Sequence, residues 1–498
     1  MTQRPNIVYI MSDDHASNAI SCYGSRLSSV FKTPNLDRIA REGVRMDHYY
    51  STNAICTPAR ATIMTGQYGH INGVRTLSDA WDPAKGPNMA ELFMQHGYET
   101  AIFGKWHLHC EPSGFYEYSV LTGQGGQGTY QNPEFISTDG QSRQHTGYVT
   151  DIITDMTVDW LQKRSRRKTG KPFFLMCHHK ASHDFWEYAA RHEHLLDGIQ
   201  VPVPESLFED KCHRSSASRN YGSSVTPRNA ARSLYADFCE EDYVTGPLRG
   251  TEHLTFEEKG FAAYQKYLKD YLRTVAGIDD SVGRILAQLE AAGELEQTII
   301  LYTSDQGMFL GEHDYQDKRW SYEESLRAPL LIRYPQEIPA GRVCTDLMAN
   351  LDMAPTLLDY AGIPVPEVMQ GVSQRDVIRG ETETEVRSSI YFRYWMHLAH
   401  KHDNPAHYGI RTKEYKLIYY YGLPLDASGA LQTPTPTGWE LYDMVADPYE
   451  LCNLYEDTRY ADVIQSLKEK LGQLKAFYHD DDLQYPELLE LLDVDSVT

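Results

Sequence analysis

A thiol, a rigid turn and a fixed cation lie close together in the segment ICTPARATIMTGQY. Cys56 is followed by Pro58 and Arg60, and a Thr-Gly pair comes near the end of the segment. A single cysteine is most often a small buried hydrophobic residue. Taken alone, Cys56 could also be the nucleophile of a cysteine hydrolase with a histidine partner. That hypothesis gives no role to the paired aspartates, Asp13 and Asp14.

Polar side chains also follow several apolar, strand-like segments of the chain. They are Asp13 and Asp14 after NIVYIM, Lys105 and His107 after ETAIFG, His183 after PFFLMC, and Asp305 and Gln306 after TIILYTS. Such short apolar runs are typical of buried strands. In open α/β sheets the functional site lies at the carboxyl ends of the strands. The sequence therefore predicts that these polar groups converge.

Helical and strand-like segments alternate along most of the chain. Residues 33–45, TPNLDRIAREGVR, are typical of a capped helix that ends at Gly43. Between Leu268 and Leu289 the apolar residues recur at helical spacing. This alternation predicts an α/β fold with a large, mostly parallel mixed sheet flanked by helices.

The composition divides the chain into two predicted domains, and the first of them contains an insertion. Residues 1–385 carry the α/β pattern and are predicted to form the catalytic domain. Within them, residues 184–260 are polar and weakly periodic, which indicates an insertion. It could shape a substrate cleft or be a surface excursion without a role, and both readings stay open. Residues 386–498 contain strand-like segments followed by a helical one, which predicts a smaller C-terminal α+β domain on an antiparallel sheet.

Charge and cysteine usage exclude several classes of protein. The 498 residues carry a formal net charge of −22, which argues against nucleic acid or an anionic membrane as the main partner. If the substrate is anionic, cations must therefore be concentrated locally. The eight cysteines are scattered without a C-x-x-C pair, so neither a zinc site nor a disulfide framework is expected. No apolar run is long enough to span a bilayer. We expect a cytoplasmic protein, or an exported one if a signal segment has been removed.

The segment CTPARATIMTG resembles the signature of the formylglycine-dependent (type I) sulfatases. Cys56, Pro58, Arg60, Thr65 and Gly66 stand at the positions of that signature. Further segments resemble family blocks in family order: NIVYIMSDDHA, TPNLDRIAREGV, GQYGHINGV, GYETAIFGKWHL, SDQGMFLGEHDYQDKRWSYEESLRAPLLIRYP and ELYDMVADPYELCNL. The resemblance covers most of the chain and is least in the predicted insertion. It implies an alkaline-phosphatase-like fold and the oxidation of Cys56 to formylglycine by a separate maturing enzyme.

The resemblance also implies one divalent metal. Its ligands would be Asp13, Asp14, Cys56 in its modified form, Asp305 and Gln306. Oxygen ligands suit calcium or magnesium and not zinc, and we favour calcium because the family mostly uses it. The family often has asparagine or histidine where this chain has Gln306.

The remaining catalytic roles come from the same resemblance. Arg60 would brace the formylglycine diol, and Lys105 and Lys318 would clamp the sulfate oxygens as charge-assisted donors. His107 would act as a base when the diol collapses to the aldehyde. His183 would protonate the leaving oxygen as general acid.

The sequence says less about the substrate than about the catalytic residues. The branch that the chain resembles most acts on sulfated carbohydrates, which predicts a sulfatase for glycosaminoglycan-derived oligosaccharides of the chondroitin/dermatan or heparin/heparan type. His407 and Arg411 could contact the sugar from the second domain or pack between the domains.

Other functions remain open from the sequence. They are a sulfatase of another sulfated polysaccharide, a phosphonate monoester or phosphodiester hydrolase of the same superfamily, and a sugar-binding protein that keeps Cys56 as a thiol. The expected partners are the sulfated carbohydrate and, transiently, the maturing enzyme. An oligomer is possible.

Overall fold

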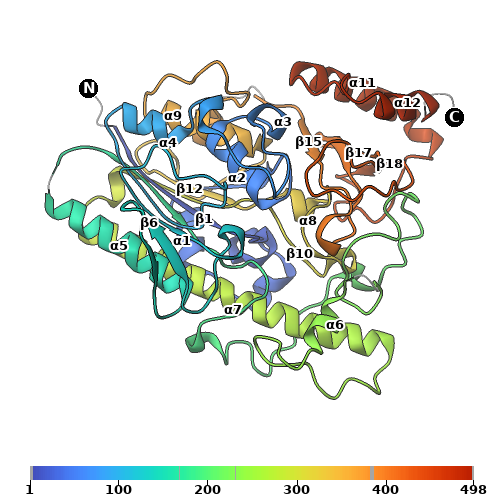
Figure 1. Ribbon diagram of the computed structural model, residues 1–498, viewed down its shortest axis with the longest axis horizontal. Coiled ribbons are helices and arrows are strands. Elements are labelled where there is room, and N and C mark those ends of the chain that lie inside the picture. The colour runs from blue at the N-terminus through green and yellow to red at the C-terminus, as the bar shows by residue number, and fades with distance from the viewer. Residues whose placement is uncertain (1–3, 168, 230–231, 382–385, 496–498) are drawn as a thin grey trace.

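The computed structural model describes residues 4–167, 169–229, 232–381 and 386–495. Within these residues a 10-stranded sheet forms the centre of the molecule (Figure 1). Its strands are β1 (Asn6–Ser12), β2 (Val44–Met46), β4 (Glu99–Gly104), β5 (Glu117–Leu121), β6 (Glu134–Ser137), β7 (Ser142–Gln144), β8 (Phe173–His178), β9 (Thr298–Ser304), β12 (Leu330–Arg333) and β13 (Arg342–Cys344). Their spatial order is β13-β2-β12-β9-β1-β8-β4-β5-β6-β7.

The helices, together with the remaining strands, surround this sheet. The α-helices are α1 (Pro34–Arg41), α2 (Cys56–Thr65), α3 (Gly69–Asn72), α4 (Met89–Gln95), α5 (Val149–Arg167), α6 (Leu234–Phe238), α7 (Phe256–Ala291), α8 (Glu323–Leu326), α9 (Met353–Tyr360), α10 (Arg375–Arg379), α11 (Ala461–Phe477) and α12 (Pro486–Asp495). The remaining strands are β3 (Tyr49–Tyr50), β10 (Phe309–Leu310), β11 (Gln316–Asp317), β14 (Met348–Ala349), β15 (Ile390–Tyr394), β16 (His407–Arg411), β17 (Tyr415–Tyr420) and β18 (Gly438–Asp443). No helix in the described ranges has both the length and the apolar composition needed to cross a membrane.

The centre of the large sheet is parallel, as the sequence predicted. Strand β1 pairs in parallel with β8 on one side and β9 on the other, and β4 continues the parallel order to β5. Antiparallel pairing appears only beyond this centre, at β12 and at β6–β7 in the described sheet. All residues of β1 are buried, because helices cover both of its faces. This explains why its sequence is continuously apolar and does not alternate.

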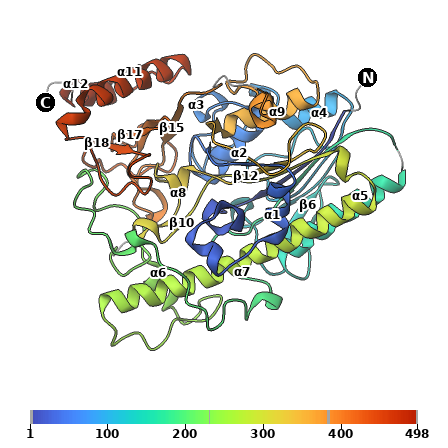
Figure 2. The ribbon, with the colours of Figure 1, turned by 180° about the vertical axis from the view of Figure 1, so that it is seen from behind.

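Alternate residues of β1 point into two separate apolar layers. Ile7 and Tyr9 pack with residues of α2, α4 and α9, whereas Val8 and Ile10 pack with residues of α1, α5 and α7. Figures 1 and 2 show these two groups of helices on opposite sides of the sheet. The predicted fold of a mostly parallel mixed sheet flanked by helices is therefore confirmed.

Helix α7 is longer than the sequence pattern indicated. It begins at Phe256, where Thr255 and Glu258 form a capping box. The predicted apolar face from Leu268 to Leu289 is buried, and the buried face also extends back to Gly260. The predicted end of the insertion, at residue 260, therefore falls inside this helix. The described remainder of the insertion consists of loops, short 3-10 turns and the short helix α6.

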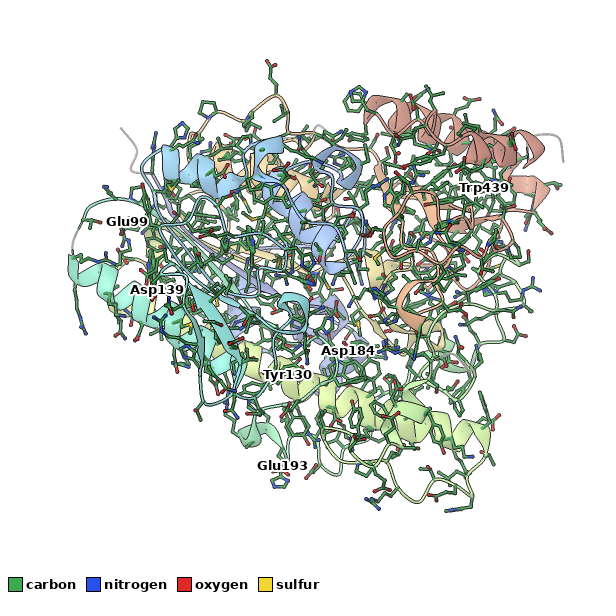
Figure 3. All side chains as sticks on the ribbon, in the orientation of Figure 1. Glu99, Tyr130, Asp139, Asp184, Glu193 and Trp439 are labelled. Carbon is green, nitrogen blue, oxygen red and sulfur yellow. The ribbon has the colours of Figure 1, made fainter. Side chains whose placement is uncertain are left out.

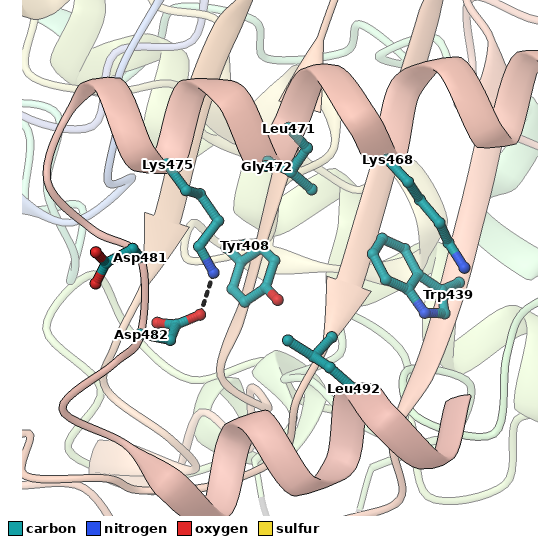
Figure 4. Close-up of a pocket in the computed structure, with 9 residues that line it drawn as sticks. All are labelled: Tyr408, Trp439, Lys468, Leu471, Gly472, Lys475, Asp481, Asp482 and Leu492. Atoms are coloured by element: carbon teal, nitrogen blue, oxygen red, sulfur yellow. Dashed lines mark hydrogen bonds and ion pairs between the residues drawn. The ribbon is translucent and has the colours of Figure 1, made fainter. Parts of the chain in front are cut away.

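The C-terminal part contains its own antiparallel sheet, in the order β15-β16-β17-β18, as predicted. The predicted domain boundary at residue 385 lies outside the described residues. Helices α11 and α12 pack near this sheet and enclose a cavity of about 310 Å³ with Tyr408 and Trp439 on its sheet side (Figure 4). An ion pair between Lys475 and Asp482 closes one end of the cavity. None of the predicted site residues lines it.

Gly104, the last residue of β4, allows β4 to lie very close to β8 beside the site. Its φ is +106°, and a Cβ atom placed there would lie 1.9 Å from the backbone oxygen of His178 in β8. The same oxygen accepts a hydrogen bond from the backbone N–H of Lys105 at 2.8 Å. Gly104 therefore lets the end of β4 lie against β8, and this contact sets the position of the Lys105 backbone.

We expect Gly104→Ala to lower the free energy of unfolding by about 3 kcal/mol, because a clash with backbone cannot be relieved by a side-chain rotation. Gly140→Ala is the matched control: Gly140 also has a positive φ, +71°, but has nothing within 4 Å of the added Cβ. The control should lose about 1 kcal/mol from its left-handed backbone alone. Chemical denaturation of both variants measures the difference, and equal losses would contradict the crowding at Gly104.

Candidate active site

The predicted site residues gather at the carboxyl ends of the central parallel strands. Asp13 and Asp14 follow β1, Lys105 follows β4, and Asp305 follows β9. Carboxylate oxygens of Asp13, Asp14 and Asp305 all lie within 4.8 Å of one another, and these side chains are at most 1% exposed. The convergence predicted from the strand ends is thus present in the structure.

Such a cluster is electrostatically unfavourable by itself. Two carboxylate charges about 5 Å apart repel by about 3 kcal/mol at an effective dielectric constant of about 20. Burial, followed by the charge of Asp13, raises the pKa of Asp305 to about 7. Burial also raises the pKa of Asp14, although Lys318 opposes it. The cluster needs positive charge close by.

The donor atoms of this cluster fit a hard divalent cation. They are carboxylate oxygens, joined by Gln306, whose Nε2 donates to Asp14 Oδ1 at 2.5 Å. The other amide atom, Gln306 Oε1, is buried and has no hydrogen-bond partner among the described residues. A buried acceptor without a donor is costly, and a cation would satisfy it. Oxygen-only donors of this kind are those that calcium and magnesium prefer.

Three cations surround the carboxylates. Arg60 Nε donates to Asp305 Oδ2 at 2.9 Å, Lys318 Nζ donates to Asp14 Oδ2 at 2.6 Å, and Lys105 Nζ donates to Asp13. Burial alone would raise the pKa of Asp13, but Lys105 and the other nearby cations hold it well below its usual range. The protein is strongly acidic as a whole, yet its buried site is rich in cations.

Cys56 occupies the first position of helix α2, directly beside the carboxylates. Its Sγ lies 3.3 Å from Asp13 Oδ1 and 3.8 Å from Gln306 Nε2. Burial, followed by the charge of Asp13, raises the pKa of the thiol well above its usual value. Among the described residues no histidine hydrogen-bonds to this sulfur. A His183 ring nitrogen lies within 4.8 Å of the sulfur but does not hydrogen-bond to it. A thiol that stays protonated without a hydrogen-bonded histidine does not suit the cysteine-hydrolase hypothesis.

The two predicted catalytic histidines have different neighbours at the site. His107 Nδ1 is 3.5 Å from the hydroxyl of Thr57, and burial, with Lys105 next, holds its pKa well below the usual value. His183 Nε2 is 3.8 Å from Asp14 Oδ2. His107 also borders a cavity of about 580 Å³ lined by the loop at residues 122–126.

The two predicted substrate contacts, His407 and Arg411, are buried in β16. His407 is 0% exposed, its Nδ1 donates to the backbone oxygen of Pro405, and its ring stacks on Trp320. Arg411 is 3% exposed and donates to Glu323 Oε1 at 2.9 Å. Their present contacts are internal to the protein. Contact with a sugar would require these side chains to move, and the role stays a prediction.

Several polar residues at the site were not identified from the sequence. Gln127 accepts a hydrogen bond from Lys105 Nζ at 2.5 Å, and Asp184 is ion-paired with His183. Asp317 and Arg319, which flank Lys318, are ion-paired at 2.7 Å, and His402 Nδ1 lies 3.0 Å from Asp317. The run Asp-Lys-Arg was a visible charge cluster; nothing local in the sequence marked Gln127 or His402.

Comparison with known proteins identifies the family. The sulfatase family model matches residues 5–363, and the model described as N-sulphoglucosamine sulphohydrolase, C-terminal, matches residues 311–477. An N-acetylglucosamine-6-O-sulfatase of Bacteroides thetaiotaomicron is 39% identical over 97% of this chain and 88% of its own. The N-acetylglucosamine-6-sulfatase of Homo sapiens is 26% identical over 79% of this chain and 67% of its own.

A solved structure supports the same conclusion. It is described as a complex with its substrate D-glucosamine-2-N,6-O-disulfate, and it superimposes with a TM-score of 0.86 at 38% identity, covering 96% of this chain and 99% of its own. The fold and the buried carboxylate–cation site define the class: a hydrolase built on the alkaline-phosphatase-like fold. The chain belongs to the sulfatase family and is a sulfuric ester hydrolase.

We expect Asp305→Asn to lose bound metal and to lower kcat/KM at least about 100-fold, because it removes one charge from the donor cluster. Elemental analysis of the purified variant measures the metal independently of activity. Asp279→Asn is the control: Asp279 is also a buried carboxylate, but it accepts from the backbone of Asn35 and Leu36 at the start of α1. If Asp305→Asn keeps its metal, the proposed ligand set is wrong.

Proposed function

We propose that this sulfatase hydrolyses a sulfate monoester on a glucosamine-type sugar from a glycosaminoglycan, using formylglycine made from Cys56 and one divalent metal, preferably calcium. The observation that carries the mechanism is the position of Cys56, between a buried carboxylate cluster and buried cations. The sugar class is supported by the names of the similar proteins and by the ligand of the similar solved structure.

Asp13, Asp14, Asp305 and Gln306 would hold the metal, beside the modified side chain of residue 56. The hydrate of formylglycine would supply a nucleophilic hydroxyl, and the metal would lower the pKa of that hydroxyl and bind a sulfate oxygen. Gln306 fits this role because its unpartnered Oε1 lies in the buried cluster.

Lys105 and Lys318 would bind the sulfate oxygens. Each ammonium group has three N–H donors. Lys105 uses donors for Asp13 and Gln127, and Lys318 lies within 3.2 Å of oxygens of Asp14 and Asp317. Each therefore keeps a donor for the charge that develops on the sulfate, in a buried site where such interactions are strong.

The histidines would move the protons. His107 is held neutral by burial and nearby cations, so it can accept a proton from the residue-56 side chain. His183 would give a proton to the leaving oxygen of the sugar, because its Nε2 faces the same carboxylates as the nucleophile.

We expect the tryptic peptide that carries Cys56 to have the mass of the aldehyde when the protein is made in a host with the maturing enzyme. Mass spectrometry of the digest measures this directly. Cys177 is the internal control, because it is equally buried but lies in β8 outside the signature, and its peptide should keep the thiol mass. A thiol at both positions in an active preparation would contradict the formylglycine mechanism.

We expect the enzyme to release sulfate from 6-O-sulfated N-acetylglucosamine with a kcat/KM at least about 100-fold higher than for phosphate release from the 6-phosphate or from a phosphonate monoester. Ion chromatography of the released anions measures both reactions. N-acetylgalactosamine 4-sulfate serves as the control for sugar and position. A preference for this control would retain the sulfatase and exclude the glucosamine substrate.

A further inference from the structure

His183 has two different surroundings for its two ring nitrogens. Nε2 faces the site, 3.8 Å from Asp14 Oδ2. Nδ1 faces away from it, 2.7 Å from Asp184 Oδ1 and 2.9 Å from the backbone oxygen of Asp184. Figure 3 shows Asp184 close to Tyr130, whose hydroxyl donates to the backbone oxygen of His183 at 2.6 Å.

These surroundings decide which nitrogen carries the transferable proton. Both neighbours of Nδ1 are acceptors, so Nδ1 keeps its proton whether the ring is charged or neutral. The proton that can leave is then the one on Nε2, which points toward the carboxylate cluster. A carboxylate that fixes the tautomer and orientation of a catalytic histidine in this way accelerates proton transfer without receiving the proton itself.

Arg232, from the predicted insertion, holds Asp184 in place. Its guanidinium donates to Asp184 Oδ2 at 2.9 Å and to His402 Nε2 at 2.8 Å. Burial alone would raise the pKa of Asp184, but His183 and Arg232 hold it well below its usual range, so the carboxylate stays charged. Through these contacts one residue of the insertion connects the loop after β8 to the C-terminal part of the chain.

The backbone just before His183 is also fixed against the end of β1. The N–H of Asp13 donates to the backbone oxygen of Ala181 at 3.0 Å, and the N–H of Ser182 donates to the backbone oxygen of Asp13 at 2.7 Å. These bonds fix the main chain that leads into His183. The contacts of Nδ1 with Asp184 then restrict the orientation of the side chain.

We propose that Asp184, the first residue of the predicted insertion, is a positioning residue for the general acid His183, and that Arg232, further along the insertion, serves the reaction by holding Asp184. The proposal rests on the acid role proposed above for His183. In the step concerned, the nucleophilic oxygen of the residue-56 hydrate forms a bond to sulfur, the bond between sulfur and the leaving oxygen breaks, and the electron pair of that bond stays on the leaving oxygen. The Nε2 proton passes to that oxygen, which gives an alcohol and a neutral imidazole protonated on Nδ1. Asp184 remains ionised throughout.

A purely structural role for Asp184 makes a different prediction. If Asp184 only anchors the insertion through Arg232, its loss should reduce the turnover of all sulfate esters alike. If it acts through His183, its loss should matter only where the leaving oxygen needs a proton. An activated phenol leaves as a stable anion, whereas an alcohol does not, so the leaving group separates the two roles.

The test compares the matured, metal-loaded enzyme with Asp184→Ala on a series of aryl and alkyl sulfates whose leaving groups differ in pKa. We expect kcat to fall about 30-fold on the alkyl sulfates and less than about threefold on 4-nitrophenyl sulfate, with KM nearly unchanged. The double variant His183→Ala with Asp184→Ala should be no slower on alkyl sulfates than His183→Ala alone, because both residues act in one step.

Asp237→Ala is the matched control. Asp237 also faces Arg232, with its Oδ2 3.9 Å from Nε. In the described part of the chain it makes no hydrogen bond or ion pair with His183. It should leave the dependence on the leaving group unchanged. An equal loss on aryl and alkyl sulfates for Asp184→Ala, or additive losses in the double variant, would overturn the proposal. Since any hydrolysed sulfate ester serves in the series, failure of the glucosamine substrate would not affect this result.

Discussion

The close burial of Asp13, Asp14 and Asp305 is the constraint on which the rest of the site depends. Carboxylates held this closely and away from water repel one another strongly, and desolvation adds to that cost. The arrangement is tolerable only if positive charge is placed against each of them. Arg60, Lys105 and Lys318 meet this requirement from the α2 helix, the end of β4 and the loop after β11. The fold must therefore bring these three segments together at the carboxyl ends of the central strands.

The same requirement explains how an acidic protein can bind an anion. The formal net charge is −22, but the charge that a buried ligand meets is set by neighbours within a few ångströms and not by the distant surface. A divalent cation would take over part of the neutralisation of the carboxylates. The lysine ammonium groups would then be free to direct their remaining donors toward the substrate. One set of charges thus stabilises the resting site, and in the proposed mechanism the same charges would serve the reaction.

The strands and helices that carry the site could be predicted from the sequence to different degrees. Strands β1, β4, β8 and β9 were found because each is an apolar run buried on both faces. Helix α5 was not identified, since much of its buried side consists of Thr150, Thr154 and Thr157, which leave a weak apolar pattern. The two- and three-residue strands, such as β2 and β3, were also missed, because two or three residues are too few to show an alternating pattern. The start of α7 was missed because its first turns mix aromatic residues with charged residues and a glycine, which leaves a weak apolar pattern.

The sequence by itself determined which reactive groups stand at the strand ends, and the resemblance of its motifs determined the family. The tertiary structure decided the partners of those groups: Gln127 on Lys105, Asp184 on His183, and Arg232 between Asp184 and His402. It also placed His407 inside an aromatic core. Local periodicity reflects only which face of a helix or strand is buried. Contacts between segments far apart in the chain depend on how loops and domains pack, and no local pattern encodes that packing.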